Sequence, residues 1–193
     1  MTGKRSWTNL INYLLFQGGW VICVVGAAKG HPHMAAVAGL FPLILHLLLV
    51  ADRRREGRLL AMALLMGCIV DGIHIRTGTL IFAASLHPAL PPPWILVLWL
   101  QFATGLRYSL HWLRRSRPTG LLLGGIAGAL AYWAGVRLGA AGFGVDVAAA
   151  LFRIGVSWVL VMAAFLYLPG LVTDDDGRAV YPILADRSRQ QRN

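Results

Sequence analysis

The chain has 193 residues, of which 57% are hydrophobic and 13% are charged, and its mean hydropathy is +0.62. A soluble domain is typically about half apolar and a quarter charged, so this composition excludes an ordinary soluble protein and favours a membrane protein. Basic residues outnumber acidic residues by 18 to 8, which by itself would suit a nucleic-acid-binding protein. Because these basic residues fall mainly in short segments between apolar runs, we expect no nucleic-acid partner.

Six apolar runs have lengths close to the ~20 residues that a helix needs to cross ~30 Å of hydrocarbon. The sequence therefore predicts an all-α membrane protein, with a single bundle of about six transmembrane helices in residues 1–168. A polar cytoplasmic tail is expected at residues 169–193. The expected spans are residues 7–28, 34–51, 59–75, 94–113, 119–139 and 146–168.

Two segments leave a choice of interpretation. The first run follows Lys4-Arg5 as a signal peptide would, but it is longer than the typical ~7–15 residue core, so we expect an uncleaved helix. Residues 79–86 are apolar but too short to cross, and Pro91-Pro92-Pro93 cannot continue a helix. Residues 79–93 are therefore expected to form either a re-entrant or interfacial segment or an ordinary outer loop.

The basic residues predict the orientation of the bundle, because they concentrate on the cytoplasmic side of membrane proteins. With the N-terminus inside, the outer loops hold only Lys29 and Arg76. The inner segments and the tail hold Lys4, Arg5, Arg53, Arg54, Arg55, Arg58, Arg114, Arg115, Arg117, Arg178, Arg187, Arg189 and Arg192. We therefore predict a multi-pass protein of a cytoplasmic (inner) membrane with both termini inside.

Polar side chains within two of the predicted spans form stripes on one face of each helix. Polar side chains are costly in hydrocarbon, so they are candidates for a functional site. We expect the two stripes to face each other and form a ligand-binding vestibule between the first and fourth helices, open to the inner side. An alternative is that they only hydrogen-bond helix to helix. The vestibule residues are Asn12, Gln17, Trp20, Gln101, Thr104, Arg107, Tyr108 and His111.

Ionisable residues also occur in the outer half of the predicted bundle. Asp71 and His74 are three residues apart on the third span and share a face. Arg153 on the sixth span lies at a comparable depth, so we predict an Asp71–Arg153 charge pair with His74 nearby. A structural role for this pair is favoured over a catalytic or proton-carrying one.

No metal site or catalytic motif is expected from the sequence. Cys23 and Cys68 both lie inside apolar runs and have no zinc-type spacing, so they are interpreted as packing residues. His46 and His111 both lie toward the inner side, which makes b-type haem ligated by this pair a low-ranked alternative to a protein without cofactors. No catalytic residue is assigned.

Four segments together resemble a family of small polytopic bacterial inner-membrane proteins catalogued as a domain of unknown function. They are residues 12–20 (NYLLFQGGW), 98–104 (LWLQFAT), 109–113 (SLHWL) and 134–140 (AGVRLGA), with Asp71 between them. The resemblance covers about Asn9 to Leu168 and implies a loose association with genes for fatty-acid-modifying enzymes of the cyclopropane-synthase type. Family members tend to carry a histidine or asparagine near Arg107–Tyr108, so this chain departs from the pattern there.

Three classes of function follow from these features, and the sequence does not decide between an enzyme and a non-enzyme. The favoured hypothesis is a protein that binds or transports an amphiphile, such as a fatty acyl lipid, through the vestibule. The first alternative is a membrane-embedded lipid-modifying enzyme or enzyme subunit, with Asp71, His74 or His111 in acid–base roles. The second is a structural or accessory membrane protein. Expected partners are membrane lipids and, through the resemblance, lipid-modifying enzymes.

Overall fold

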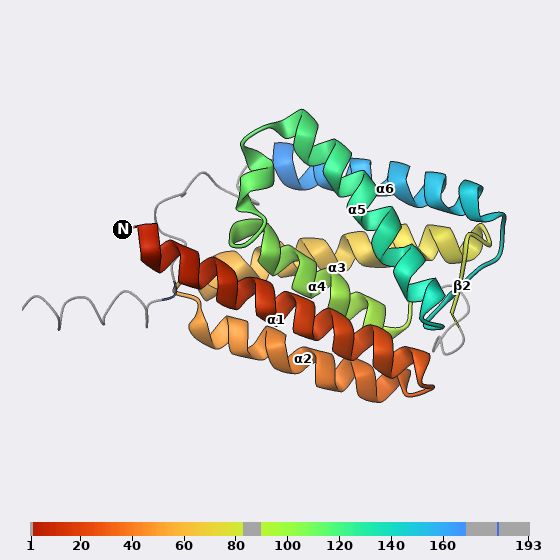
Figure 1. The fold of residues 1–193 in the computed structure, drawn as a ribbon, viewed down its shortest axis with the longest axis horizontal. Helices are drawn as coiled ribbons and strands as arrows, with labels where there is room; N and C mark the ends of the chain where they lie inside the picture. The colour runs from red at the N-terminus through yellow and green to blue at the C-terminus, as the bar shows by residue number, and fades with distance from the viewer. Residues whose placement is uncertain (1, 83–89, 169–180, 182–193) are drawn as a thin grey trace, which may run out of the picture.

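The computed structural model describes residues 2–82, 90–168 and 181, and most of them are helical (Figure 1). The helices of this part of the chain are α1 Thr2–Ala28, α2 Pro32–Leu49, α3 Arg53–Arg76, α4 Pro93–Arg107, α5 Arg117–Arg137 and α6 Val147–Tyr167. All of these except α4 are long and apolar enough to cross a membrane. The predicted fold class, an all-α bundle of several membrane helices, is confirmed.

The fourth predicted span, residues 94–113, is wrong as one continuous helix. Helix α4 ends at Arg107, and the chain turns through residues 108–110 into a short 3-10 helix, η1 His111–Arg114. The backbone N–H groups of Tyr108 and Leu110 both donate to the carbonyl of Gly105, at 3.1 and 2.8 Å, and close this turn. With 15 residues at 1.5 Å each, α4 covers ~22 Å, less than the ~30 Å of a hydrocarbon core.

Two helices begin where an aspartate caps their first turn. Asp52 accepts a hydrogen bond from the backbone N–H of Arg55 at 3.0 Å, so α3 starts at Arg53, earlier than the predicted residue 59. This backbone bond lowers the pKa of Asp52. Asp146 caps α6 in the same way by accepting from the N–H groups of Ala148 and Ala149.

The described part of residues 79–93 contains a short strand, β1 Leu80–Ile81. It pairs antiparallel with β2 Gly142–Phe143, in the connection between α5 and α6. This pairing ties the α3–α4 connection to the α5–α6 connection at one end of the bundle (Figure 1). Residues 83–89 and all of the predicted tail, 169–193, except Tyr181 lie outside the described residues.

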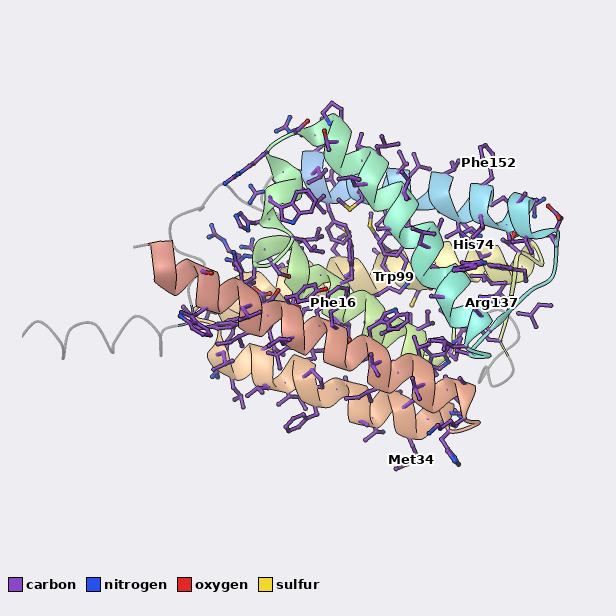
Figure 2. The ribbon with its side chains drawn as sticks, in the orientation of Figure 1. Phe16, Met34, His74, Trp99, Arg137 and Phe152 are labelled. Atoms are coloured by element: carbon purple, nitrogen blue, oxygen red, sulfur yellow. The ribbon has the colours of Figure 1, made fainter. Side chains whose placement is uncertain are left out.

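Helix α4 occupies the centre of one half of the molecule, where it packs against α1, α2 and α3. Helices α5 and α6 pack on each other as a hairpin that forms the other half (Figure 1). The outside of the bundle is apolar: Met34 of α2 is 68% exposed and Phe152 of α6 is 74% exposed, and both point away from the bundle (Figure 2). Such a surface suits a hydrocarbon environment.

Candidate functional site

The polar vestibule predicted between α1 and α4 is not formed. Gln101 is buried and donates from Nε2 to the carbonyl of Gly39 on α2 at 2.7 Å, while Thr104 donates to the carbonyl of Gln101 in its own helix at 2.7 Å. Gln17 lies on the exposed side of α1, where its amide donates to Tyr13 Oη at 3.1 Å. These side chains connect helices or face outward, so the prediction of one shared vestibule is wrong.

Other residues of the predicted vestibule join a buried polar network at the end of the bundle where α3 begins and α4 ends. Asn12 of α1 is fully buried, and its Oδ1 accepts from the hydroxyl of Ser109 at 2.7 Å. Arg107 of α4 donates to Glu56 of α3 at 2.7 Å, and the Glu56 side chain is fully buried. This ion pair joins the start of α3 to the end of α4. It compensates the buried carboxylate, because a buried charge without a partner is strongly destabilising.

His46 connects this ion pair to the C-terminal segment. Its Nε2 lies 2.9 Å from Glu56 Oε1 and its Nδ1 lies 3.0 Å from the hydroxyl of Tyr181. Because a carboxylate only accepts, Nε2 carries the hydrogen and Nδ1 accepts from Tyr181. Burial raises the pKa of the Tyr181 phenol, so this hydroxyl keeps its proton. Tyr181 also stacks on Tyr108, with ring centroids 5.4 Å apart.

The geometry gives no support to haem ligation by His46 and His111. Both ring nitrogens of His46 already have hydrogen-bond partners. His111 lies in η1, where its Nδ1 is 2.6 Å from the carbonyl of Tyr108. Within the described residues, no group of three or more His, Cys, Asp or Glu side chains is placed to hold a metal ion.

The predicted Asp71–Arg153 pair is also wrong, because the two groups have different partners. Asp71 is fully buried, and its carboxylate accepts from Trp99 Nε1 at 2.7 Å and from Tyr132 Oη at 2.6 Å. Arg153 donates to Thr79 Oγ1 at 3.2 Å. The third member of the predicted group, His74, lies 2.9 Å from Ser157 Oγ.

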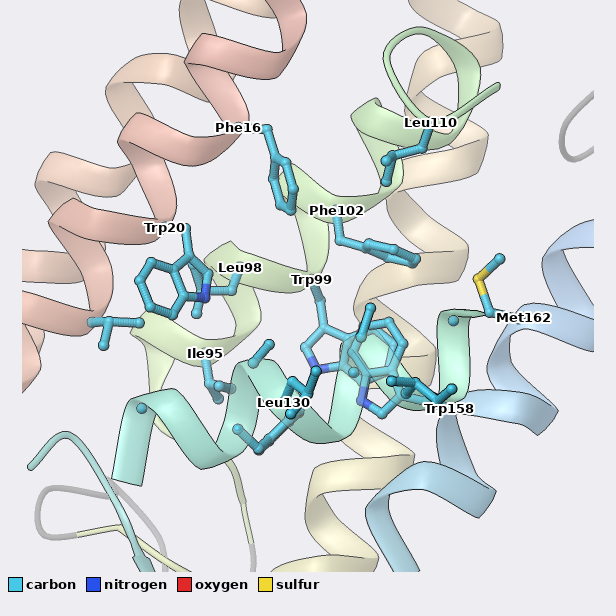
Figure 3. A pocket seen from close by; sticks show the side chains of 18 of the residues that line it. Phe16, Trp20, Ile95, Leu98, Trp99, Phe102, Leu110, Leu130, Trp158 and Met162 are labelled. Carbon is cyan, nitrogen blue, oxygen red and sulfur yellow. The ribbon is translucent and has the colours of Figure 1, made fainter. Parts of the chain in front are cut away.

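The described structure contains an apolar cavity of about 410 Å³ between the α1–α4 half and the α5–α6 hairpin (Figure 3). Of its 24 lining residues none is charged, and five are tryptophans, out of seven in the chain. The aromatic lining residues are Phe16, Trp20, Phe82, Trp94, Trp99, Phe102, Trp112, Tyr132 and Trp158. Among the residues predicted to line the vestibule, Trp20 is the one that lines this cavity.

Three of the aromatic side chains that line the cavity pack against one another. Trp99 of α4 stacks on Trp158 of α6, with centroids 4.9 Å apart and ring planes 14° apart. Phe102 stands edge-on to Trp158 at 4.8 Å (Figure 3). Gly128 of α5 makes room for this arrangement, because a Cβ there would overlap the indole of Trp158. The small residues of α5 therefore let large rings from α4 and α6 meet beside it.

The sequence of residues 9–164 matches the profile of a family described as a protein of unknown function, DUF2878. The chain belongs to this family. The match begins within α1 and ends within α6, and it includes all the residues that line the cavity. Neither a curated protein nor a solved structure shows significant similarity to the chain.

In this DUF2878 member, the sequence alone did not point to several residues that the structure brings together. Glu56 lies in a basic stretch that was interpreted as an exposed inner loop, and Tyr181 lies in the predicted solvated tail. A signal for Glu56 was available, since it is the one acidic residue among Arg53–Arg58. No local pattern marks Trp99, Tyr132 and Trp158 as neighbours, because they lie on three different helices.

Proposed function

We propose that this protein binds or transports an amphiphile, whose apolar part occupies the aromatic cavity. A fatty acyl chain is the first candidate, and the setting is the cytoplasmic membrane of a bacterium. The observation that carries the proposal is the cavity itself: about 410 Å³, lined almost entirely by apolar and aromatic side chains. Sites for small ligands are typically clefts of ~300–1,000 Å³ with such linings.

The position of the cavity supports entry from the bilayer. Its α5 wall includes Leu123, Ile126 and Leu130, which are 37%, 49% and 54% exposed. Residues that both line the cavity and reach the outer surface mark an opening on the apolar side of the bundle. Along α5 the lining runs from Leu123 to Gly135, or ~18 Å at 1.5 Å per residue. This exceeds half of a ~30 Å hydrocarbon core, so a chain from one leaflet matches it in length.

The residues that line the cavity favour a ligand-binding protein over a lipid-modifying enzyme. A lipid-modifying enzyme needs an acid, base, nucleophile or metal within reach of the bound substrate. The residues that line the cavity include no histidine, cysteine or charged residue. The buried groups of this kind around Glu56, Asp71 and His74 already have hydrogen-bond partners inside the protein.

Fluorescence quenching by a brominated chain tests the proposal, because bromine quenches indole on contact and five tryptophans line the cavity. The purified protein in maltoside micelles is titrated with ω-bromododecanol, and saturable quenching is expected. Ala127→Phe places a ring at the α5 wall of the cavity and should weaken binding by about tenfold or more, equivalent to ~1.4 kcal/mol.

Leu122→Phe is the matched control, since Leu122 is an exposed residue of the same helix that does not line the cavity. It should leave the quenching curve unchanged. Linear, unsaturable quenching that is identical in the unmodified protein and in both variants would show that the cavity is not a binding site.

A further inference from the structure

A buried carboxylate lies directly behind the aromatic wall of the cavity. Asp71 accepts from Nε1 of Trp99 and from Oη of Tyr132, and both of these side chains line the cavity. Each carboxylate oxygen receives one donor, and hydrogen bonds to both oxygens favour the ionised group. One layer of rings therefore separates the cavity from the negative charge of this carboxylate.

No positive group of the described residues neutralises this charge. The described ion pairs join Glu56 to His46 and to Arg107, and none includes Asp71. The nearest candidate from the sequence, Arg153, donates to Thr79 instead. A carboxylate in the membrane interior is costly without a partner, so the cavity side of Asp71 favours a positive ligand and disfavours a negative one.

The aromatic lining of the cavity also favours a positively charged ligand. The faces of tryptophan, tyrosine and phenylalanine rings carry partial negative charge and attract cations, and aromatic cages recognise quaternary ammonium groups in this way. Donation of the Trp99 and Tyr132 hydrogens to a carboxylate raises the electron density of their rings further. The lining holds no charged group, so it has nothing with which to pair an anion.

We propose that the cavity selects a lipophilic cation, of which an alkyl chain carrying a quaternary ammonium group is the simplest form. This inference rests on the proposed function and names the class of amphiphile. The chain occupies the apolar length of the cavity, and the cationic group lies against the rings that Asp71 anchors. A free amphiphilic cation is preferred to a choline lipid, because a phosphate beside the ammonium would bring a second negative charge toward Asp71.

The test compares head groups on one chain in the unmodified protein. Tryptophan quenching in maltoside micelles is measured with ω-bromododecyltrimethylammonium, ω-bromododecanol and ω-bromododecanoate. The ammonium compound should bind at least about tenfold more tightly than the alcohol, the size of a cation–π contribution in a water-poor site. The carboxylate should bind most weakly. Equal affinities, or a preference for the carboxylate, would overturn the inference but leave amphiphile binding intact.

A substitution tests whether Asp71 causes the preference for the ammonium compound. Asp71→Asn keeps an acceptor oxygen and the size of the side chain, and it should lower the affinity of the ammonium compound relative to that of the alcohol until the preference is lost. Asp52→Asn removes an exposed carboxylate at the inner end of α3 and should retain the preference. A preference that survives Asp71→Asn would show that Asp71 does not cause it.

Two further outcomes separate this inference from its alternatives. Dodecylphosphocholine is added as a competitor, and displacement of the ammonium probe at equal concentration would assign the site to a lipid head group instead. If none of the three probes quenches saturably, the proposed function fails as well, because the cavity then binds no chain at all. The head-group series needs no substitution, so it decides the question even if Asp71→Asn does not fold.

Discussion

Single glycines decide where the large side chains of this bundle lie. A Cβ at Gly128 would overlap the indole of Trp158, and one at Gly67 would come within 2.6 Å of the ring of Trp99. A Cβ at Gly19 would overlap the amide of Gln101. Glycine lowers helix stability by ~1 kcal/mol relative to alanine. At these three positions the close packing of a large side chain against the helix offsets that cost.

The residue-scale prediction compares two helical glycines. Gly128→Ala forces the Trp158 ring away from its stack with Trp99 and should lower stability by about 1–3 kcal/mol, as overpacking does. Gly18→Ala adds a methyl group with no atom of another helix within 4 Å, so it should be neutral or stabilise by up to ~1 kcal/mol. Thermal unfolding in detergent, followed by near-ultraviolet circular dichroism, measures both. Equal melting temperatures for the two variants would contradict this account.

At the scale of the elements, polar side chains join helices that are distant in the sequence. Glu56 at the start of α3 meets Arg107 at the end of α4 and His46 near the end of α2. Its burial makes the interaction sensitive to the loss of one partner, because a buried charge is then left without compensation. The early end of α4 makes the contact to α1 possible, since the turn after Arg107 places Ser109 against Asn12.

Removing the Glu56 charge tests this connection. Glu56→Gln leaves Arg107 without its carboxylate and should destabilise the protein by about 3–5 kcal/mol. The double variant Glu56→Gln, Arg107→Gln should regain a large part of this loss, because both charges are gone. The melting temperature in detergent is the measurement, and Asp52→Asn is the control, since asparagine also caps helices. Additive losses in the double variant would show that the two residues are not coupled.

At the scale of the whole molecule, the arrangement is two helical halves with an aromatic cavity between them. The halves meet through the walls of this cavity and through the β1–β2 pairing at one end. The exposed surface of both halves is apolar, which agrees with a multi-pass membrane protein. The orientation of the bundle in the membrane follows from the distribution of basic residues and stays a prediction.

Reporter fusions test this orientation. Alkaline phosphatase is active only outside the cytoplasm, so fusions after Arg58, Arg117 and Arg189 should be inactive and a fusion after Gly142 should be active. A fluorescent protein that folds only inside the cell should give the opposite pattern. The α1–α2 loop holds Lys29 and α3 ends at Arg76, and these are the basic residues expected on the outer side. An active phosphatase after Arg117 would reverse the topology.

The sequence by itself determined the class of the protein and most of its helices. Long apolar runs, interrupted by basic segments, leave few alternatives to membrane helices, because backbone polar groups must be satisfied within the segment in hydrocarbon. The start of α6 was likewise predicted next to its cap, Asp146, whereas α3 was predicted to start at residue 59, although Asp52 caps it at Arg53. The end of α4 was missed, because the apolar run continues past the turn at Tyr108.

Only the tertiary structure decided which polar groups are partners and where the cavity lies. Helical spacing gives the face of a side chain but not the neighbour that this face meets, so Asp71 was matched to Arg153 and not to Trp99 and Tyr132. Gln101 likewise donates to the carbonyl of Gly39 on α2, and Gly19 of α1 leaves room for its amide. The cavity depends on how the α5–α6 hairpin packs against α1 and α4, and contacts between distant helices leave no local pattern in the sequence.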